Sequence, residues 1–242
     1  MIEIINLHKK FGQQEVLRGV DLKIPSGQTM ALIGGSGKGK SVLLKHIIGL
    51  LKPDSGKVLI DNLDISSLWG KNLKDLKDRC GIVFQGGALF DSLSVYDNVA
   101  FPLREKTRLS PGEINKRVLT ELDSVGLKSD QNKFPAQLSG GMKKRVALAR
   151  CLVMNPQIIL FDEPTTGLDP MTTKSIHNLI KSLQSKRHLS ALIVSHEIPE
   201  IFNIVDQVAM LHNGRIITTG TPAEFQQSQN PIVQQFLHGE LQ

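Results

Sequence analysis

Residues 29–51 read TMALIGGSGKGKSVLLKHIIGLL and carry more structural information than any other part of the chain. The apolar run 29–33 is typical of a strand buried on both faces. It leads into a loop of the form G-x-x-x-x-G-K-[ST], and the apolar segment Val42–Leu51 predicts a buried helix. Because glycines let successive backbone N–H groups point inward and a helix N-terminus adds a positive dipole, the stretch predicts a phosphate-binding loop.

The loop residues have distinct expected tasks. Lys40 is expected to reach the β- and γ-phosphates of a nucleotide, and the Ser41 hydroxyl is expected to bind Mg²⁺. A flexible glycine linker would need neither the strand before the loop nor the helix after it. The residues expected to contact the nucleotide are Gly34, Gly35, Ser36, Gly37, Lys38, Gly39, Lys40, Ser41 and Val42.

Two further apolar runs end abruptly in polar residues. Ile158–Phe161 leads into Asp162 and Glu163, and Ala191–Val194 leads into Ser195 and His196. Ligands bind beyond the carboxyl ends of the strands in open parallel α/β sheets, so we expect all three strand ends to meet at one edge. One of the two adjacent carboxylates would hold Mg²⁺, the other would orient an attacking water, and the histidine would reach the γ-phosphate.

Composition narrows the class of protein. The 242 residues are 40% hydrophobic and 21% charged, with a formal net charge of +6. No apolar run approaches the ~18–20 residues of a membrane-spanning helix, and the first residues do not resemble a signal peptide. Cys80 and Cys151 lie far apart, which favours two reduced thiols over a metal site. We expect a soluble, cytosolic protein, and dispersed lysines with few aromatics give no reason to expect a nucleic-acid partner.

A second glycine-rich segment opens a helix without a strand before it. Leu138–Met142 reads LSGGM and precedes the helix-forming residues 143–150. Ser-Gly-Gly at a helix start is another anion site. It is hard to place beside the first loop within one subunit, and it makes sense if it meets a nucleotide held by a second copy of the chain.

Together these motifs resemble those of the ATP-binding subunit of an ATP-binding cassette (ABC) transporter, over essentially the whole chain. Each motif alone has false positives, whereas the ordered set is very specific. In order, Phe11 matches the aromatic that stacks on adenine, Gly34–Ser41 the Walker A loop, Gln85 the Q-loop glutamine, Leu138–Met142 the signature, Ile158–Glu163 Walker B, Gly167–Asp169 the D-loop and His196 the switch histidine.

The resemblance implies an α/β P-loop ABC ATPase with a RecA-like parallel-sheet core, an N-terminal antiparallel β subdomain and an inserted α-helical subdomain. The core with its β subdomain would comprise residues 1–85 and 157–221, the helical subdomain residues 86–156, and a C-terminal extension residues 222–242. Alternating apolar residues in the first 58 positions suit the small antiparallel sheet, with Phe11 in a turn.

The resemblance also implies a head-to-tail homodimer that binds ATP and Mg²⁺. Ser139, Gly140 and Gly141 of one subunit would close on ATP held by the other, beside the D-loop Asp169. Glu163, His196 and Gln85 are the implied catalytic residues, and Ser41, Gln85 and Asp162 are the implied metal ligands.

Residues 86–105 and 139–145 resemble the ATPase of the Mla/Mce-type lipid transporters. That resemblance implies phospholipid transport between inner and outer membranes, a place on the cytoplasmic face of the inner membrane, a permease subunit, a small accessory cytoplasmic subunit and a periplasmic lipid-binding subunit. Apolar residues in this segment would either line a groove for a short helix of the membrane subunit or pack the helical subdomain. They are Leu89, Phe90, Leu93, Val95 and Phe101.

The C-terminal extension carries an apolar stripe at helical spacing. In the Mla-type ATPases a similar tail reaches the partner protomer and the accessory subunit, while folding back on its own domain is the plainer alternative. The stripe consists of Ile232, Val233, Phe236 and Leu237.

Two residues depart from the family pattern. Lys38 replaces a small residue and is expected to point to solvent, and Val42 replaces a hydroxyl residue, which removes one side-chain contact to the α-phosphate. Three other functions stay open: another ABC importer or exporter, a soluble ABC protein acting on nucleic acid or ribosomes, and a P-loop small-molecule kinase. The second usually needs two cassettes or a coiled-coil insertion, and the third leaves Leu138–Met142 without a task.

Overall fold

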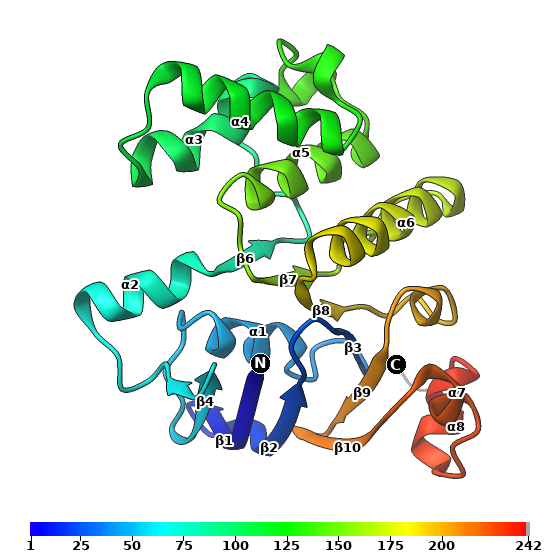
Figure 1. Ribbon diagram of the computed structural model, residues 1–242. Helices are drawn as coiled ribbons and strands as arrows, with labels where there is room; N and C mark the ends of the chain where they lie inside the picture. Colours follow the sequence, from blue (N-terminus) through cyan, green and yellow to red (C-terminus); the bar gives the residue numbers. More distant parts are fainter. Residues whose placement is uncertain (241–242) are drawn as a thin grey trace.

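The computed structural model describes residues 1–240, which form two β-sheets with helices around and above them (Figure 1). The N-terminal sheet is antiparallel, in the order β2-β1-β4-β5, and it confirms the antiparallel sheet predicted for this part of the chain. Phe11 is the last residue of β1, directly before the turn. The strands of this sheet are β1 (Ile2–Phe11), β2 (Gln14–Ile24), β4 (Ser55–Ile60) and β5 (Leu63–Asp64).

The second sheet has the order β10-β9-β3-β8-β7-β6. Its strands run parallel except for β10, which pairs antiparallel with β9 at the edge. Every residue of β3 and β8 is buried, as continuous apolar runs predict for strands covered on both faces. The strands are β3 (Thr29–Ile33), β6 (Cys80–Val83), β7 (Ile158–Asp162), β8 (Ser190–Val194), β9 (Gln207–His212) and β10 (Arg215–Gly220).

Helices cover both faces of this parallel sheet. Helix α1 (Lys40–Ile47) packs in the hydrophobic cluster it shares with the antiparallel sheet, and α5 (Gly140–Leu152) and α6 (Pro170–Arg187) contribute to the other cluster. The prediction of a helix over Val42–Leu51 was wrong at both ends. The helix begins at Lys40 and ends at Ile47, because Gly49 takes a positive φ of 64° that stops it.

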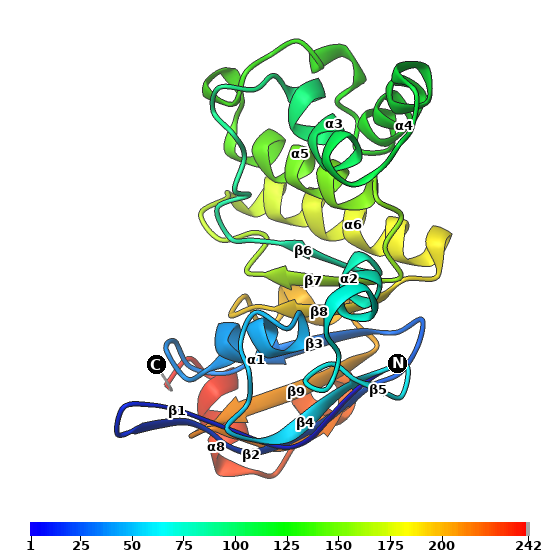
Figure 2. The same cartoon turned by 90° about the vertical axis from the view of Figure 1, so that its left-hand side faces the viewer.

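A helical region lies beyond β6 and β7 (Figure 2). Ser110 caps α4 in a capping box with Glu113, and Pro111 is the first helical residue. The second half of the apolar segment 86–105 forms α3. This region contains α3 (Val95–Lys106), α4 (Pro111–Ser124) and the 3₁₀ turns Lys128–Asp130 and Pro135–Gln137. Outside it, α2 (Gly70–Asp78) lies beside β6, and a further 3₁₀ turn, Glu200–Asn203, lies between β8 and β9 in the sequence.

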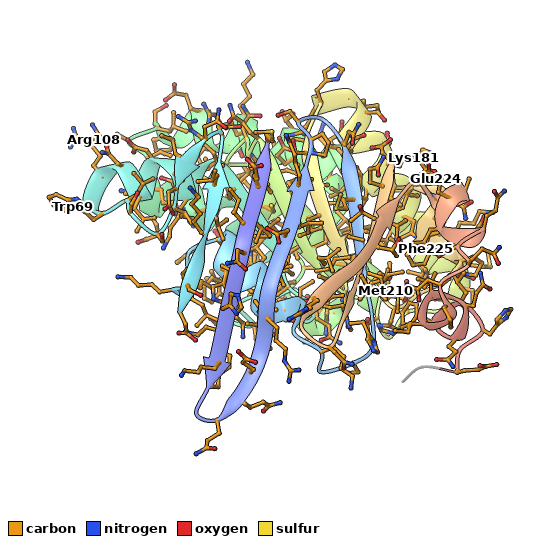
Figure 3. The ribbon with its side chains drawn as sticks, turned by 90° about the horizontal axis from the view of Figure 1, so that it is seen from below. Trp69, Arg108, Lys181, Met210, Glu224 and Phe225 are labelled. Carbon is orange, nitrogen blue, oxygen red and sulfur yellow. The ribbon has the colours of Figure 1, made fainter. Side chains whose placement is uncertain are left out.

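The C-terminal helices α7 (Pro222–Gln226) and α8 (Pro231–Leu237) pack against their own domain. Phe225 is almost fully buried, its ring lies 5.8 Å from that of Phe202, and it belongs to the same cluster as Met210 of β9 (Figure 3). Val233 of the predicted apolar stripe is fully buried, and the other three stripe residues are partly buried against the same cluster. Of the two alternatives for the extension, folding back is therefore the one observed in the single chain.

Candidate active site

The glycine-rich loop joins β3 to α1 at the carboxyl edge of the parallel sheet. Gly34 has a φ of 145°, and a Cβ atom there would lie 2.2 Å from the carbonyl oxygen of Leu211. Gly39, with a φ of 105°, precedes the first residue of α1. These two positions accept no side chain, which explains the glycines at each end of the loop. Between them, Lys38 is exposed, so its expected orientation toward solvent agrees with the structure.

Lys40 lies inside the loop. Its Nζ atom donates hydrogen bonds of 2.8 Å to the carbonyl oxygens of Gly34 and Gly35. Burial lowers the pKa of the Lys40 ammonium, and the carboxylates of Glu163 and Asp162 oppose that shift. The positive charge is therefore held at the N-terminus of α1, where the backbone N–H groups also favour an anion.

Ser41 of α1 and Asp162 of β7 come together at this edge. The Ser41 hydroxyl donates a 3.0 Å hydrogen bond to Oδ1 of Asp162. Burial raises the pKa of the Asp162 carboxyl, the nearby Glu163 carboxylate adds to the shift, and the Ser41 hydroxyl opposes it. A cation at this position would be favoured, because it would offset the cost of burying the Asp162 charge and the repulsion between the two carboxylates.

The oxygen atoms of Ser41 and Asp162 suit Mg²⁺, which prefers hard oxygen ligands and takes few of them from the protein. Gln85 is exposed, and within residues 1–240 no hydrogen bond joins its side chain to either of these residues. The same residues contain no cluster of three or more His, Cys, Asp and Glu side chains suited to a metal. The site therefore fits an ion that is held largely by phosphate and water oxygens.

Glu163 and His196 meet at the ends of the neighbouring strands β7 and β8. His196 Nδ1 lies 3.4 Å from Oε1 of Glu163, and the Thr166 hydroxyl donates a 3.1 Å hydrogen bond to Oε2. Glu163 has a φ of 50°, and its backbone N–H donates to the Val194 carbonyl. The structure thus gathers the loop, the carboxylate pair and the histidine at one edge, as the three strand ends predict.

A cluster of three polar side chains next to His196 was not predicted from the sequence. The Thr165 hydroxyl donates to Oε2 of Glu197, and His177 Nε2 of α6 lies 3.7 Å from the same oxygen. Burial lowers the pKa of His177, and the carboxylates of Glu197 and Glu200 oppose the shift. The hydrogen bond from Thr165 to Glu197 therefore joins the segment that follows Glu163 to the segment that follows His196. Spacing in the sequence gives no signal for these contacts, because the three residues belong to separate elements.

The second glycine-rich segment lies apart from the first. Ser139 caps α5 by accepting a 3.3 Å hydrogen bond from the Met142 backbone N–H, as expected for a helix opened by Ser-Gly-Gly. A Cβ on Gly141 would lie 2.5 Å from a methyl group of Thr172. Asp169 caps α6 beside it, accepting a 3.0 Å hydrogen bond from the Thr172 N–H. Helices α5 and α1 lie on opposite sides of β6 and β7, so one chain does not bring Ser139 onto its own phosphate loop (Figures 1 and 2).

Phe11 is 46% exposed, with Lys9 Nζ 5.6 Å from the centre of its ring. It is not a core aromatic, and an exposed ring at the end of β1 is available for stacking.

Comparison with known proteins identifies the family. The ABC transporter family model matches residues 17–166, which include the glycine-rich loop, the signature segment and the carboxylate pair. The chain belongs to the ABC transporter family. It is an ATP-binding subunit that hydrolyses ATP, as the resemblance implied.

The relatives of this ABC ATPase are named after different transported substrates. It is 44% identical to the probable ribonucleotide transport ATP-binding protein mkl of Mycobacterium leprae, over 98% of this chain and 69% of the relative. It is 41% identical to the intermembrane phospholipid transport system ATP-binding protein MlaF of Haemophilus influenzae, over 99% of this chain and 91% of the relative. The chain spans about two thirds of the mycobacterial proteins and nearly all of MlaF.

Solved structures confirm the α/β ABC ATPase fold. The ATP-binding cassette MJ0796, in a dimeric post-hydrolysis state with ADP and Pi, has a TM-score of 0.83 and 35% identity over 92% of this chain and 99% of that one. None of the helices within residues 1–240 has both the length and the apolar character required to cross a membrane.

Proposed function

We propose that this ABC ATPase powers a transporter of the Mla type, which moves phospholipids between the inner and outer membranes. The observation that carries the proposal is the match to MlaF, which extends over 99% of this chain and 91% of that protein. The subunit would lie on the cytoplasmic face of the inner membrane, bound to a permease. An accessory cytoplasmic subunit and a periplasmic lipid-binding subunit complete the proposed assembly, and no nucleic acid takes part.

In the proposed mechanism two copies of the chain enclose two ATP molecules. Phosphoryl transfer needs positive charge and a positioned nucleophile more than covalent help. Lys40 and the loop N–H groups bind the phosphates, Glu163 orients the attacking water, and His196 holds the γ-phosphate edge. Ser41 and Asp162, with Gln85, would hold Mg²⁺, which neutralises charge on the phosphates. Ser139, Gly140 and Gly141 of the partner close the site beside Asp169, and Phe11 stacks on the adenine.

A surface depression of about 370 Å³ supports the proposal that a helix of the permease docks on this chain. Phe90 and Phe101 line it, their ring centres lie 4.7 Å apart, and both are more than a third exposed. Of the two alternatives given for the five apolar residues, Leu89, Leu93 and Val95 do not follow the first, because none of them lines the depression. Val95 is fully buried in the core at the start of α3, and the two leucines are half-buried outside the depression.

The first test addresses hydrolysis. Glu163→Gln keeps the size of the side chain but removes the carboxylate charge, so we expect ATP binding to persist while turnover falls by about a hundredfold or more. The variant should accumulate as an ATP-bound dimer in size-exclusion chromatography with light scattering. Normal turnover would remove Glu163 from this role.

The second test addresses the cargo. The chain and the membrane proteins that co-purify with it are placed in vesicles that contain labelled phospholipid. We expect ATP-dependent transfer of the label to acceptor vesicles, and its loss in the Glu163→Gln complex. Transfer of a ribonucleotide or an amino acid in place of lipid would favour another ABC importer or exporter, an alternative that the mkl relative supports.

A further inference from the structure

Helix α5 holds the loop that follows β6 by two basic side chains. Lys144 Nζ donates to the carbonyl oxygen of Gln85. One turn and a half further along, the guanidinium of Arg150 donates hydrogen bonds of 2.7 Å to the carbonyl oxygens of Gly87 and Ala88. Three carbonyls of this short loop are therefore bound to one helix.

The loop depends on these donors. Gly87 and Ala88 both have positive φ values, 71° and 48°, and this fold of the main chain is costly for alanine. Because no strand or helix follows directly, the loop carbonyls need partners outside it. Arg150 satisfies the two at the turn, and Lys144 satisfies the one at Gln85.

Lys144 is an unusual choice for this contact. It is only 8% exposed, and burial lowers the pKa of its ammonium, while the carboxylates of Glu197 and Glu163 oppose the shift. A buried ammonium is costly unless it is bonded and faces negative charge. Both conditions hold here, because Lys144 donates to the Gln85 carbonyl and faces the carboxylates of Glu197 and Glu163.

The same lysine stands close to the signature. Four residues separate it from the first residue of α5, Gly140, which corresponds to about 6 Å along the helix axis. A rigid helix transmits a shift of its middle to its N-terminus. If α5 moves as one body, a shift of the Gln85 main chain held by Lys144 would also shift Ser139 and Gly140.

We propose that Lys144 is a positioning residue that joins the Gln85 main chain to the signature end of α5, so that nucleotide bound at one chain's own loop sets the signature in place for the nucleotide of the partner. The proposal rests on the head-to-tail dimer of the proposed function. It adds a link between the two sites that runs through Lys144, a side chain outside the named motifs.

The test uses ATP-driven dimerisation in the Glu163→Gln background, with the full chain. Lys144→Met keeps the length and apolar stem but removes the donor and the charge. We expect the ATP concentration for half-maximal dimerisation to rise by at least about fivefold, with the ATP affinity of the monomer unchanged within about twofold. Lys144→Arg, which keeps a charged donor, should restore most of the dimerisation.

Lys143→Met is the matched control, because within residues 1–240 the side chain that donates to the Gln85 carbonyl is that of Lys144, and K143M should dimerise normally. If K144M does not fold, Lys144→Gln replaces it with the same expected result, since its amide is shorter and uncharged. The inference would be overturned if K144M dimerised at the same ATP concentration as the Glu163→Gln chain that keeps Lys144. It would also be overturned if K144M and K144R raised that concentration equally. If Glu163→Gln alone fails to dimerise with ATP, the proposed function fails instead.

Discussion

Lys38 sits in the middle of the phosphate-binding loop without taking part in its packing. The side chain is exposed, whereas Lys40, two residues later, is buried and bonded to the Gly34 and Gly35 carbonyls. One of these two positive charges therefore belongs to the site and the other to the surface.

We predict that Lys38→Ser changes the ATPase rate by less than about tenfold, which is ~1.4 kcal/mol of barrier. Lys40→Ala is the control, and it should lose ATP binding or turnover because the phosphates lose their main positive charge. Both rates come from the same phosphate-release assay. A hundredfold loss in the Lys38 variant would mean that its ammonium contacts the nucleotide.

Residue-level prediction succeeded where the chemistry depends on neighbours in the chain. The glycine-rich loop, the adjacent carboxylates and the histidine each follow a buried strand, so their common edge could be predicted from the strands alone. Lys144 was missed because its partner lies 59 residues away in the sequence, and a lysine in a polar helix start looks like a solvated residue. The sequence left Val95 open between a groove and the core, because apolar character alone does not distinguish the two, and the structure places it in the core.

At the scale of elements, α6 carries a titratable group into the core. His177 is 3% exposed, and burial lowers its pKa below the usual value for histidine, with Thr165 and the carboxylates of Glu197 and Glu200 around it. Since the unfolded chain binds a proton at a pH where the folded chain does not, this histidine stabilises the fold fully above its unfolded pKa. The contribution begins to fall as the pH drops below that value, about 6.5, and is lost as the pH falls through the lower pKa of the folded chain.

We therefore predict that the free energy of unfolding decreases between pH 7.5 and pH 5.5, and that His177→Gln makes this decrease smaller. Urea unfolding at several pH values measures it. Buried His46, whose pKa burial also lowers, keeps part of the slope in the variant. His238→Gln, at an exposed position, is the control and should leave the slope unchanged. An identical slope in H177Q and the native chain would show that folding does not lower the pKa of His177.

Helix α5 shows how one element serves several surfaces. Its N-terminus carries the signature, Lys144 reaches Gln85, and Arg150 reaches the loop after β6. Arg150 also lines the depression proposed for the permease, with its guanidinium 5.9 Å from the centre of the Phe90 ring. A helix pressed into that depression would therefore act on the same side chain that holds the loop. The residue limits given above for the core, the helical subdomain and the C-terminal extension stay a prediction.

At the scale of the whole molecule, the separation of α1 from α5 has a direct consequence. The phosphate loop and the signature segment lie on opposite sides of β6 and β7 within one chain (Figures 1 and 2). If the signature completes the site, only a second copy can supply it. The ATPase rate per chain should then rise with protein concentration and fall on dilution, as the fraction of dimer falls.

A mixing experiment distinguishes a head-to-tail dimer from other causes of an ATPase rate that depends on protein concentration. Lys40→Ala disables the loop of one chain, and Ser139→Phe obstructs the signature of another, so each variant alone should be inactive. In a head-to-tail mixed dimer both defects fall on one site, and the other site is built from an intact loop and an intact signature. An equal mixture should recover about a quarter of the native rate, because half of the dimers are mixed and each has one working site. Two variants that stay inactive when mixed, while a native chain remains active as a monomer, would mean that each chain completes its own site.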